Sequence, residues 1–117
     1  MKTLIIINDP PYGSERVYNA LRLALALNKK NPEQTVDVFL MADAVAAAKA
    51  GQETPNGYYN IERMLKLVLV NKGRVLLCGT CMNARGLDDA AIMEGARRSS
   101  MAELTEITEA ADKVLVF

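Results

Sequence analysis

The sequence contains no histidine and no tryptophan, and only two cysteines stand among its 117 residues. A zinc site within one chain therefore lacks ligands, because structural zinc takes four cysteine or histidine side chains. We expect no metal site. General acid and base roles fall to carboxylates, tyrosines, lysines or the two thiols.

An excess of charge of one sign is also absent. The 14 basic and 14 acidic residues cancel, and no block of five or more basic residues occurs. This balance predicts neither a nucleic-acid partner nor binding to an anionic membrane. The apolar run Leu4–Ile7 is too short for a signal-peptide core or a membrane span. We expect a cytoplasmic protein whose two cysteines are reduced at rest.

The length suits one domain over residues 1–117 with a core that needs no disulfide. Five short β-prone segments alternate with helical patterns, which predicts a three-layer α/β sandwich around a five-stranded parallel sheet. The expected strands are residues 4–8, 35–41, 75–77, 95–98 and 113–117.

Local signals predict where the helices begin and end. Ser14 is expected to cap a first helix that runs to about Lys30, with Glu15 in its first turn. A short alanine-rich helix should follow from Asp43 to Gly51, and Asn60 should cap a helix that Gly73 ends. Residues 52–59 form a loop by composition, and a short turn or helix is expected over residues 88–93. Ser100 and Glu103 predict a capping box for the last helix, which should turn residues 101, 104, 107 and 111 inward.

Cys78 follows the buried run Val75–Leu77 and should lie at the carboxyl end of that strand, where parallel α/β sheets bind ligands. Gly79 would let the backbone turn sharply and would leave space beside the sulfur. Cys78 could also be an inert core thiol, since free cysteine is often buried.

Cys81 and Arg85 stand close to Cys78 in the sequence. A guanidinium group or a helix amino end beside the sulfur would lower the pKa of the Cys78 thiol. Arg85 could instead pair with Asp88 or Asp89 on the surface. Cys81 could be a resolving thiol, or simply a cysteine in a loop. Arg97 and Arg98 are interpreted as a solvated rim rather than as ligand-binding residues.

The turn after the first strand is the other candidate wall of the site. Asn8, Asp9, Tyr12 and Gly13 would project from the same sheet edge as Cys78, beside the helix amino end. A polar turn with a helix cap is the structural alternative. No glycine-rich phosphate-binding pattern is present, so nucleotide binding is not supported.

An ordered set of motifs covers essentially the whole chain. It comprises Pro11-Tyr12-Gly13-Ser14-Glu15, Leu21-Arg22-Leu23-Ala24, Phe39-Leu40-Met41-Ala42-Asp43-Ala44-Val45, Gly57-Tyr58-Tyr59-Asn60-Ile61, Leu77-Cys78-Gly79-Thr80-Cys81, Arg85-Gly86 and Ala111-Asp112-Lys113-Val114-Leu115. With these motifs the chain resembles the DsrE/DsrF-like family, and within it the small YchN-like proteins.

The resemblance implies a Rossmann-like fold, assembly into trimers or hexamers, and a cysteine after the third strand. In sulfur-relay relatives the cysteine that matches Cys78 carries a persulfide and works with donor and acceptor proteins. This chemistry requires no cofactor. The YchN-like members resemble homo-oligomers instead.

Two functions remain open. The first is sulfur transfer, in which Cys78 holds a persulfide, Cys81 releases it and Arg85 stabilises the anionic sulfur. The second is a non-enzymatic homo-oligomeric ligand-binding or interaction module. A thioredoxin-type oxidoreductase fits less well, because the Cys-x-x-Cys segment lacks a preceding aromatic residue and an internal proline.

The helical patterns also predict self-association. Apolar residues of the first helix cover an arc of about 200°, roughly twice the stripe that a one-sided surface helix needs. Either a neighbouring helix or a second subunit should cover the remainder. Together with the small-faced segment Ala44–Ala50, this surface predicts a homo-oligomer. Because the resemblance implies trimers or hexamers, we expect a hexamer, with Cys78 near a subunit boundary.

Overall fold

The computed structural model describes residues 1–57 and 59–117 and contains one five-stranded sheet. Its strands are β1 (Lys2–Ile7), β2 (Thr35–Leu40), β3 (Val75–Cys78), β4 (Arg97–Ser99) and β5 (Lys113–Val116). Every neighbouring pair is parallel, and the order is β4-β3-β2-β1-β5. The predicted five-stranded parallel sheet is therefore confirmed.

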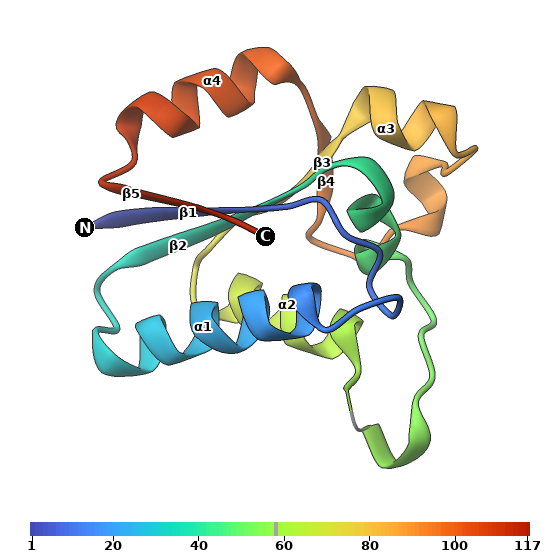
Figure 1. Ribbon diagram of the computed structural model, residues 1–117, viewed down its shortest axis with the longest axis horizontal. Helices are drawn as coiled ribbons and strands as arrows, with labels where there is room; N and C mark the ends of the chain where they lie inside the picture. Colours follow the sequence, from blue (N-terminus) through green and yellow to red (C-terminus); the bar gives the residue numbers. More distant parts are fainter. Residues whose placement is uncertain (58) are drawn as a thin grey trace.

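Helices cover both faces of this sheet (Figure 1). Helices α1 (Arg16–Lys30) and α2 (Ile61–Val70) lie on one face, and α4 (Met101–Ala110) lies on the other. The short helix α3 (Gly79–Ala84) and the 3-10 helix η1 (Ala42–Ala48) lie where β3 and β2 end. Two further 3-10 turns are η2 (Pro55–Gly57) and η3 (Asp89–Ala91). The three-layer α/β/α sandwich is confirmed.

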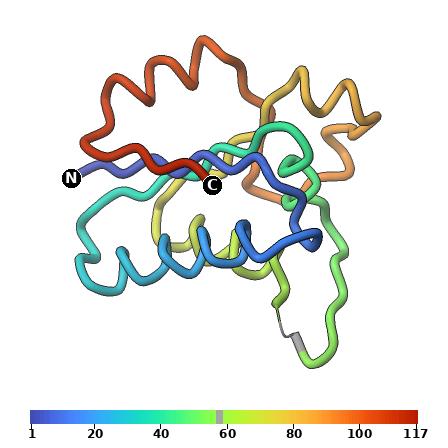
Figure 2. The backbone as a smooth tube through the Cα atoms, in the orientation of Figure 1, coloured from blue at the N-terminus to red at the C-terminus, as the bar shows by residue number. Residues whose placement is uncertain are grey.

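The path of the backbone places the two chain ends on neighbouring strands, β1 and β5 (Figure 2). The segment between η1 and α2 extends away from the sheet. It corresponds to the predicted loop over residues 52–59, of which Tyr58 lies outside the described residues. No described helix has both the length and the apolar character that a membrane crossing needs.

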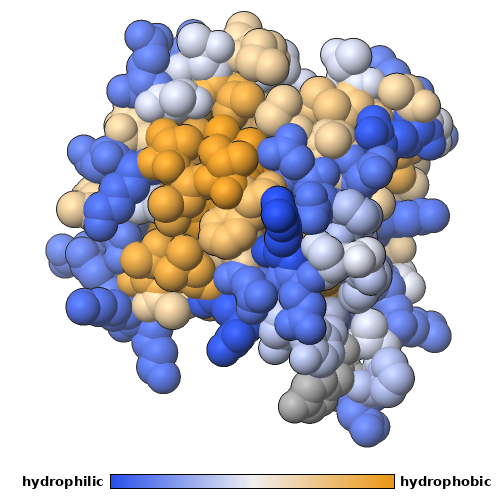
Figure 3. All heavy atoms as spheres, viewed as in Figure 1, coloured by the Kyte–Doolittle hydropathy of each residue, from blue (hydrophilic) through white to orange (hydrophobic). Residues whose placement is uncertain are grey.

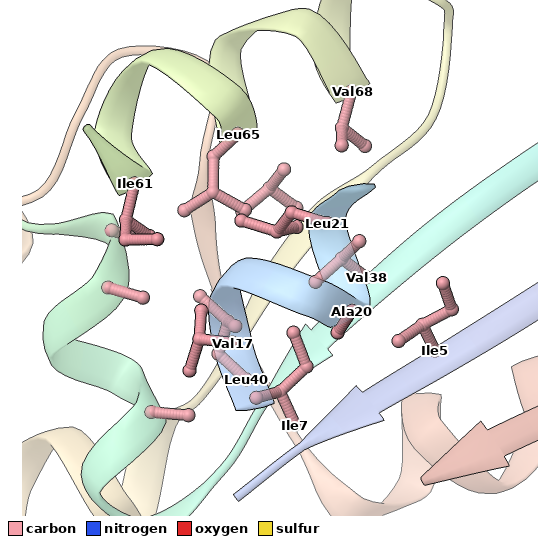
Figure 4. Packing of buried hydrophobic residues seen from close by; sticks show 14 of the residues in the cluster. Ile5, Ile7, Val17, Ala20, Leu21, Val38, Leu40, Ile61, Leu65 and Val68 are labelled. Carbon is pink, nitrogen blue, oxygen red and sulfur yellow. The ribbon is translucent and has the colours of Figure 1, made fainter. Parts of the chain in front are cut away.

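Alternate side chains of the strands enter two separate cores. On one face, residues of β1 and β2 pack against α1 and α2 (Figure 4), and on the other Leu4, Phe39 and Leu76 pack against Leu104 and Ile107 of α4. Burying each such side chain stabilises the fold by about 1.5–3 kcal/mol. The side chains that Figure 4 labels are Ile5, Ile7, Val17, Ala20, Leu21, Val38, Leu40, Ile61, Leu65 and Val68.

The second apolar flank of α1 lies against α2, which is one of the two alternatives that the sequence left open. The small side chains of η1 are also covered within the chain, because Ala44, Val45, Ala47 and Ala48 are fully buried. The expectation that both surfaces stay open for another subunit was wrong for η1, whereas Leu23 of α1 is still 37% exposed.

The predicted start of α1 was also wrong. The helix begins at Arg16, and Glu15 rather than Ser14 occupies its N-cap position, with no side-chain bond. The Ser14 hydroxyl donates to the carboxylate of Asp9 at 2.8 Å and accepts from the Arg16 amide at 3.3 Å. Ser14 therefore closes the preceding turn instead of capping the helix.

Asn60 and Ser100 cap their helices as predicted. The Asn60 side chain accepts from the Arg63 amide at 3.0 Å, and the Ser100 hydroxyl accepts from the Glu103 amide at 3.2 Å. Met101, which was expected to point inward, is 62% exposed.

Only half of the predicted capping box forms, because the Glu103 carboxylate turns toward β4. Arg97 donates to its two oxygens at 2.8 and 2.6 Å, and the Ser99 hydroxyl donates to one of them. The bonds from Arg97, and then that from Ser99, lower the pKa of Glu103 to about 2.

Gly73 was predicted to end α2, but the residue with the left-handed backbone conformation after this helix is Lys72, with φ of 69°. Gly73 is needed for a close approach of two backbone segments. A Cβ atom at this position would lie 2.0 Å from the carbonyl oxygen of Val36 in β2.

Gly73→Ala should therefore destabilise the protein by about 1–3 kcal/mol, because the added methyl group would push β2 and the start of β3 apart. Urea unfolding measures this loss. Gly51→Ala is the matched control, since Gly51 has a φ of 87° and nothing within 4 Å of its Cβ position, so only a backbone cost of about 1 kcal/mol is expected. Equal losses in the two variants would contradict the steric role of Gly73.

Candidate functional site

Cys78 lies at the carboxyl end of β3, as the sequence predicted. Val75, Leu76 and Leu77 are buried, whereas Cys78 is half-buried and is the N-cap residue of α3. The backbone amide of Cys81 donates to Cys78 Sγ at 3.3 Å. The sulfur atom thus takes the place that a serine or aspartate oxygen usually occupies at the start of a helix.

The two thiols are in direct contact. Cys81 Sγ donates to Cys78 Sγ at 2.6 Å, and both cysteines are free and half-buried. A disulfide bond is about 2.05 Å long. A small side-chain movement would therefore link the two sulfur atoms.

The pKa of the Cys78 thiol is raised. Burial is the largest cause, and the hydrogen bond with Cys81 raises it further, whereas the backbone amides of Cys81 and Thr80 act in the opposite direction. The expectation of a lowered pKa was wrong, because the second thiol and the surrounding side chains outweigh the amino end of a helix of only six residues. With its pKa raised, Cys78 holds its proton at rest, and loss of that proton activates it as a nucleophile.

Arg85 does not stabilise the sulfur in the way that was predicted. Its Nε atom forms an ion pair with Asp43 Oδ1 at 2.8 Å, and its guanidinium group donates to the Cys81 carbonyl oxygen at 3.1 Å. The predicted surface pair with Asp88 or Asp89 was wrong as well. Arg85 thus connects α3 to η1, because its side chain binds both the Cys81 carbonyl oxygen and the Asp43 carboxylate.

Gly79 has a role different from the predicted one. It is the buried first residue of α3, and its φ is not positive. A Cβ atom there would lie 3.0 Å from Arg98 Cγ and 3.1 Å from the Ser99 carbonyl oxygen. The missing side chain thus makes room for β4 and Arg98 rather than for the sulfur.

The turn after β1 lies at the same edge of the sheet as Cys78, but its side chains form a separate site. The backbone amide of Asn8 donates to the Phe117 carbonyl oxygen at 2.9 Å, and Asp9 Oδ2 lies 3.7 Å from Arg16 Nε. The Tyr12 hydroxyl donates to Gln52 at 2.5 Å and accepts from the Ile61 amide at 3.2 Å. These bonds connect the turn to the start of α2.

A pocket of about 420 Å³ lies beside this turn and is rich in tyrosine. The rings of Tyr18 and Tyr59 are 4.3 Å apart between their centroids, and Tyr12 lines the same pocket. No residue of the cysteine segment contributes to it. The lining residues are Pro11, Tyr12, Gly13, Ser14, Glu15, Tyr18, Tyr59 and Ile61. The site residues predicted as one set therefore divide into a thiol pair and a tyrosine pocket.

Arg98 is a site residue that the sequence analysis missed, because it was assigned to a solvated rim. It donates to the Gly79 carbonyl oxygen and to Asn83 Oδ1, each at 2.9 Å, and so contacts both ends of α3. The pairing of Cys78 with Ser99 in the sheet register brings it there. Within the described residues, no three side chains of histidine, cysteine, aspartate or glutamate gather closely enough to hold a metal ion.

Comparisons of the sequence with known proteins all point to the same family. The sequence pattern described as "DsrE/DsrF-like family" matches residues 1–117. Protein YchN of Escherichia coli K12 is 40% identical over 116 residues, which covers 99% of this chain and 98% of that protein. An uncharacterized protein of Methanocaldococcus jannaschii is 36% identical over 117 residues, with all of both chains covered.

Solved structures agree with this assignment. The crystal structure of YchN from Escherichia coli superposes with a TM-score of 0.94 and covers 100% of this chain and 99% of that one. A protein of unknown function from Methanobacterium thermoautotrophicum shares the fold at 14% identity, with a TM-score of 0.79 and 97% of each chain covered.

The raised pKa of Cys78 can be tested by titration. In Cys81→Ala, the pKa of Cys78 should fall relative to the wild type, because the hydrogen bond that raises it is gone, while the effect of burial stays. Cys78 should thus remain protonated to higher pH in the wild type than in the variant. The rate of alkylation of Cys78 against pH, assigned to this residue by tandem mass spectrometry, measures the difference. Identical profiles in both proteins would contradict the role of Cys81.

Proposed function

Because the chain belongs to the DsrE/DsrF-like family, we propose that it carries sulfur as a persulfide on Cys78. Family membership favours a function of the sulfur-relay type. The observation that supports Cys78 as the carrier is its thiol contact with Cys81 at 2.6 Å, at the exposed end of a buried strand. The reducing cytoplasm predicted from the sequence would keep both thiols free.

Loading is a thiol exchange reaction. Cys78 loses its proton, and the resulting thiolate attacks the outer sulfur of a donor persulfide, R–S–SH. The sulfur–sulfur bond of the donor breaks, and the donor leaves as the thiolate R–S⁻. Cys78 becomes Cys78–S–SH, and the transferred sulfur keeps its oxidation state. No cofactor is therefore needed.

Unloading can follow two balanced routes. The thiolate of an acceptor protein can attack the outer sulfur, so that Cys78 leaves as a thiolate. Alternatively, the Cys81 thiolate attacks the inner sulfur, HS⁻ leaves, and a Cys78–Cys81 disulfide forms that an external dithiol then reduces. The short distance between the two sulfur atoms favours Cys81 for this second step.

The tyrosine pocket favours a second candidate function, a ligand-binding or interaction module without sulfur transfer. It lies apart from the cysteine segment and is built from rings that hydrogen bonds and packing hold in place. A protein that only binds a ligand there would not need a reactive thiol. Retention of sulfur on Cys78 distinguishes the two functions.

We also propose a homo-oligomer, a trimer or a hexamer, with the edge strand β5 in the interface. Val116 and Val114 are 65% and 39% exposed, and Leu23 of α1 is 37% exposed. Figure 3 shows apolar side chains gathered over β5 between α1 and α4. Edge strands with open hydrogen-bonding groups and apolar side chains are typical sites of association. Since β1 and β2 separate β5 from β3, Cys78 would lie near the boundary only if a neighbour's β5 contacted the opposite edge.

Persulfide loading can be followed by mass spectrometry of the intact protein after exposure to a persulfide donor. Cys81→Ser should still gain one sulfur on Cys78, because the attack needs only the Cys78 thiolate, whereas Cys78→Ser should gain none on Cys81. Equal loading of both variants would mean that the roles are wrongly assigned. No retained sulfur on Cys78 in Cys81→Ser, in which Cys81 cannot release it, would overturn sulfur transfer and favour the binding module.

Assembly can be tested with Val116→Lys, which places a charge on the apolar edge. We expect the wild type to sediment as three or six chains and this variant to shift toward the 12.8 kDa monomer. Val70→Lys is the matched control, because Val70 is 74% exposed at the end of α2, and it should leave the mass unchanged. A wild-type mass near that of one chain at micromolar concentration would contradict the proposed oligomer.

A further inference from the structure

Arg98 extends from β4 across the short helix that presents the cysteines. Its guanidinium group donates to the Gly79 carbonyl oxygen and to Asn83 Oδ1 at 2.9 Å each, and its Nε donates to Asp89 Oδ1 at 2.9 Å. The side chain is only one-third exposed. Three bonds in different directions hold the guanidinium plane in one orientation, which a lysine could not reproduce.

The bond to Gly79 is of particular interest because it fixes the first turn of α3. Gly79 and Asn83 lie near the two ends of this helix, and Arg98 donates to both. The same helix presents the Cys81 backbone amide, which donates to Cys78 Sγ at 3.3 Å. A hydrogen-bond donor to the sulfur favours the thiolate, so the placement of α3 bears on the reactivity of Cys78.

We propose that Arg98 is a positioning residue for Cys78, which holds α3 against β4 and so keeps the Cys81 backbone amide in place at the sulfur. The inference rests on the proposed function, in which Cys78 is the reacting thiol. Gly79 supports it, because any side chain there would meet Arg98 Cγ at 3.0 Å and displace the guanidinium group.

Two nearby arginines provide comparisons. Arg97 lies next to Arg98 on β4, but its two hydrogen bonds go to the Glu103 carboxylate of α4. Arg85 donates to the Cys81 carbonyl oxygen at 3.1 Å, and its ion pair with Asp43 connects α3 to η1 rather than to β4. Arg97 is therefore the matched control, since it lies on the same strand and bonds to a different helix.

The test is the pH dependence of alkylation by iodoacetamide in the full chain carrying Cys81→Ser, so that only Cys78 reacts. Arg98→Met keeps the aliphatic part of the side chain and removes the charge. It should raise the pKa that governs alkylation by about 0.5–1 and slow the reaction at pH 7 about two- to fivefold, because a higher thiolate basicity offsets part of the lost thiolate. Arg98→Lys should raise the pKa by less than Arg98→Met, because an ammonium group keeps the charge but not all three bonds, and Arg97→Met should leave the profile unchanged.

Arg98→Gln is a second neutral variant in case the methionine variant does not fold, since its amide can still donate to Gly79. It should raise the same pKa by a smaller amount. A wild-type pKa in every neutral Arg98 variant that folds would overturn the inference, even if its thermal midpoint falls, because a purely structural role lowers stability without moving the pKa. Failure of both neutral variants to fold would also overturn it, since it assigns Arg98 to the thiol and not to the global fold.

Persulfide loading of Cys81→Ser, with and without Arg98→Met, separates this inference from the proposed function, because Cys81 cannot release the sulfur in this background. A shifted pKa in Arg98→Met together with no loading of Cys78 in Cys81→Ser would overturn sulfur transfer and support the positioning role. Loading of Cys78 in Cys81→Ser together with an unshifted pKa in Arg98→Met would support sulfur transfer and overturn the positioning role.

Discussion

Strand β3 is paired on both edges, with β2 on one side and β4 on the other. Its residues Val75, Leu76 and Leu77 are buried between the two helical layers. A slip of one residue would turn every side chain to the opposite face, so the register is strongly specified. The position of Cys78, the start of α3 and the contact between the thiols all depend on that register.

Cys78 both ends the strand and caps the helix, and this double position shapes its chemistry. The cap supplies backbone donors to the sulfur, which favour the thiolate. Burial and the neighbouring Cys81 thiol favour the protonated form more strongly. The site is therefore a pair of contacting thiols in which Cys78 is not permanently ionised.

The sheet order separates two possible sites along one edge. The direction of the strand order reverses between β1 and β5, and such switch points are where open α/β sheets usually bind ligands. The turn that follows β1 carries the tyrosine pocket. Cys78 ends β3, so the thiol pair depends on a local strand-to-helix turn and not on the switch-point crevice. A protein of this design can accommodate a reactive thiol and a separate binding pocket.

The sequence by itself determined those features that neighbouring residues control. The apolar β-prone runs located four of the five parallel strands, Asn60 and Ser100 marked two helix starts, and the run Val75–Leu77 located Cys78 at a strand end. In each of these cases the physical cause lies within a few residues of the chain.

Only the tertiary structure decided which distant groups meet. Arg85 reaches Asp43, Arg98 reaches α3, and Gly73 lies against Val36, although each pair is separated by many residues. The same holds for the division of the predicted site, because Tyr12 bonds to Gln52 and Ile61 rather than facing Cys78. These contacts follow from strand order and register, which the burial of the whole sheet selects and no local pattern encodes.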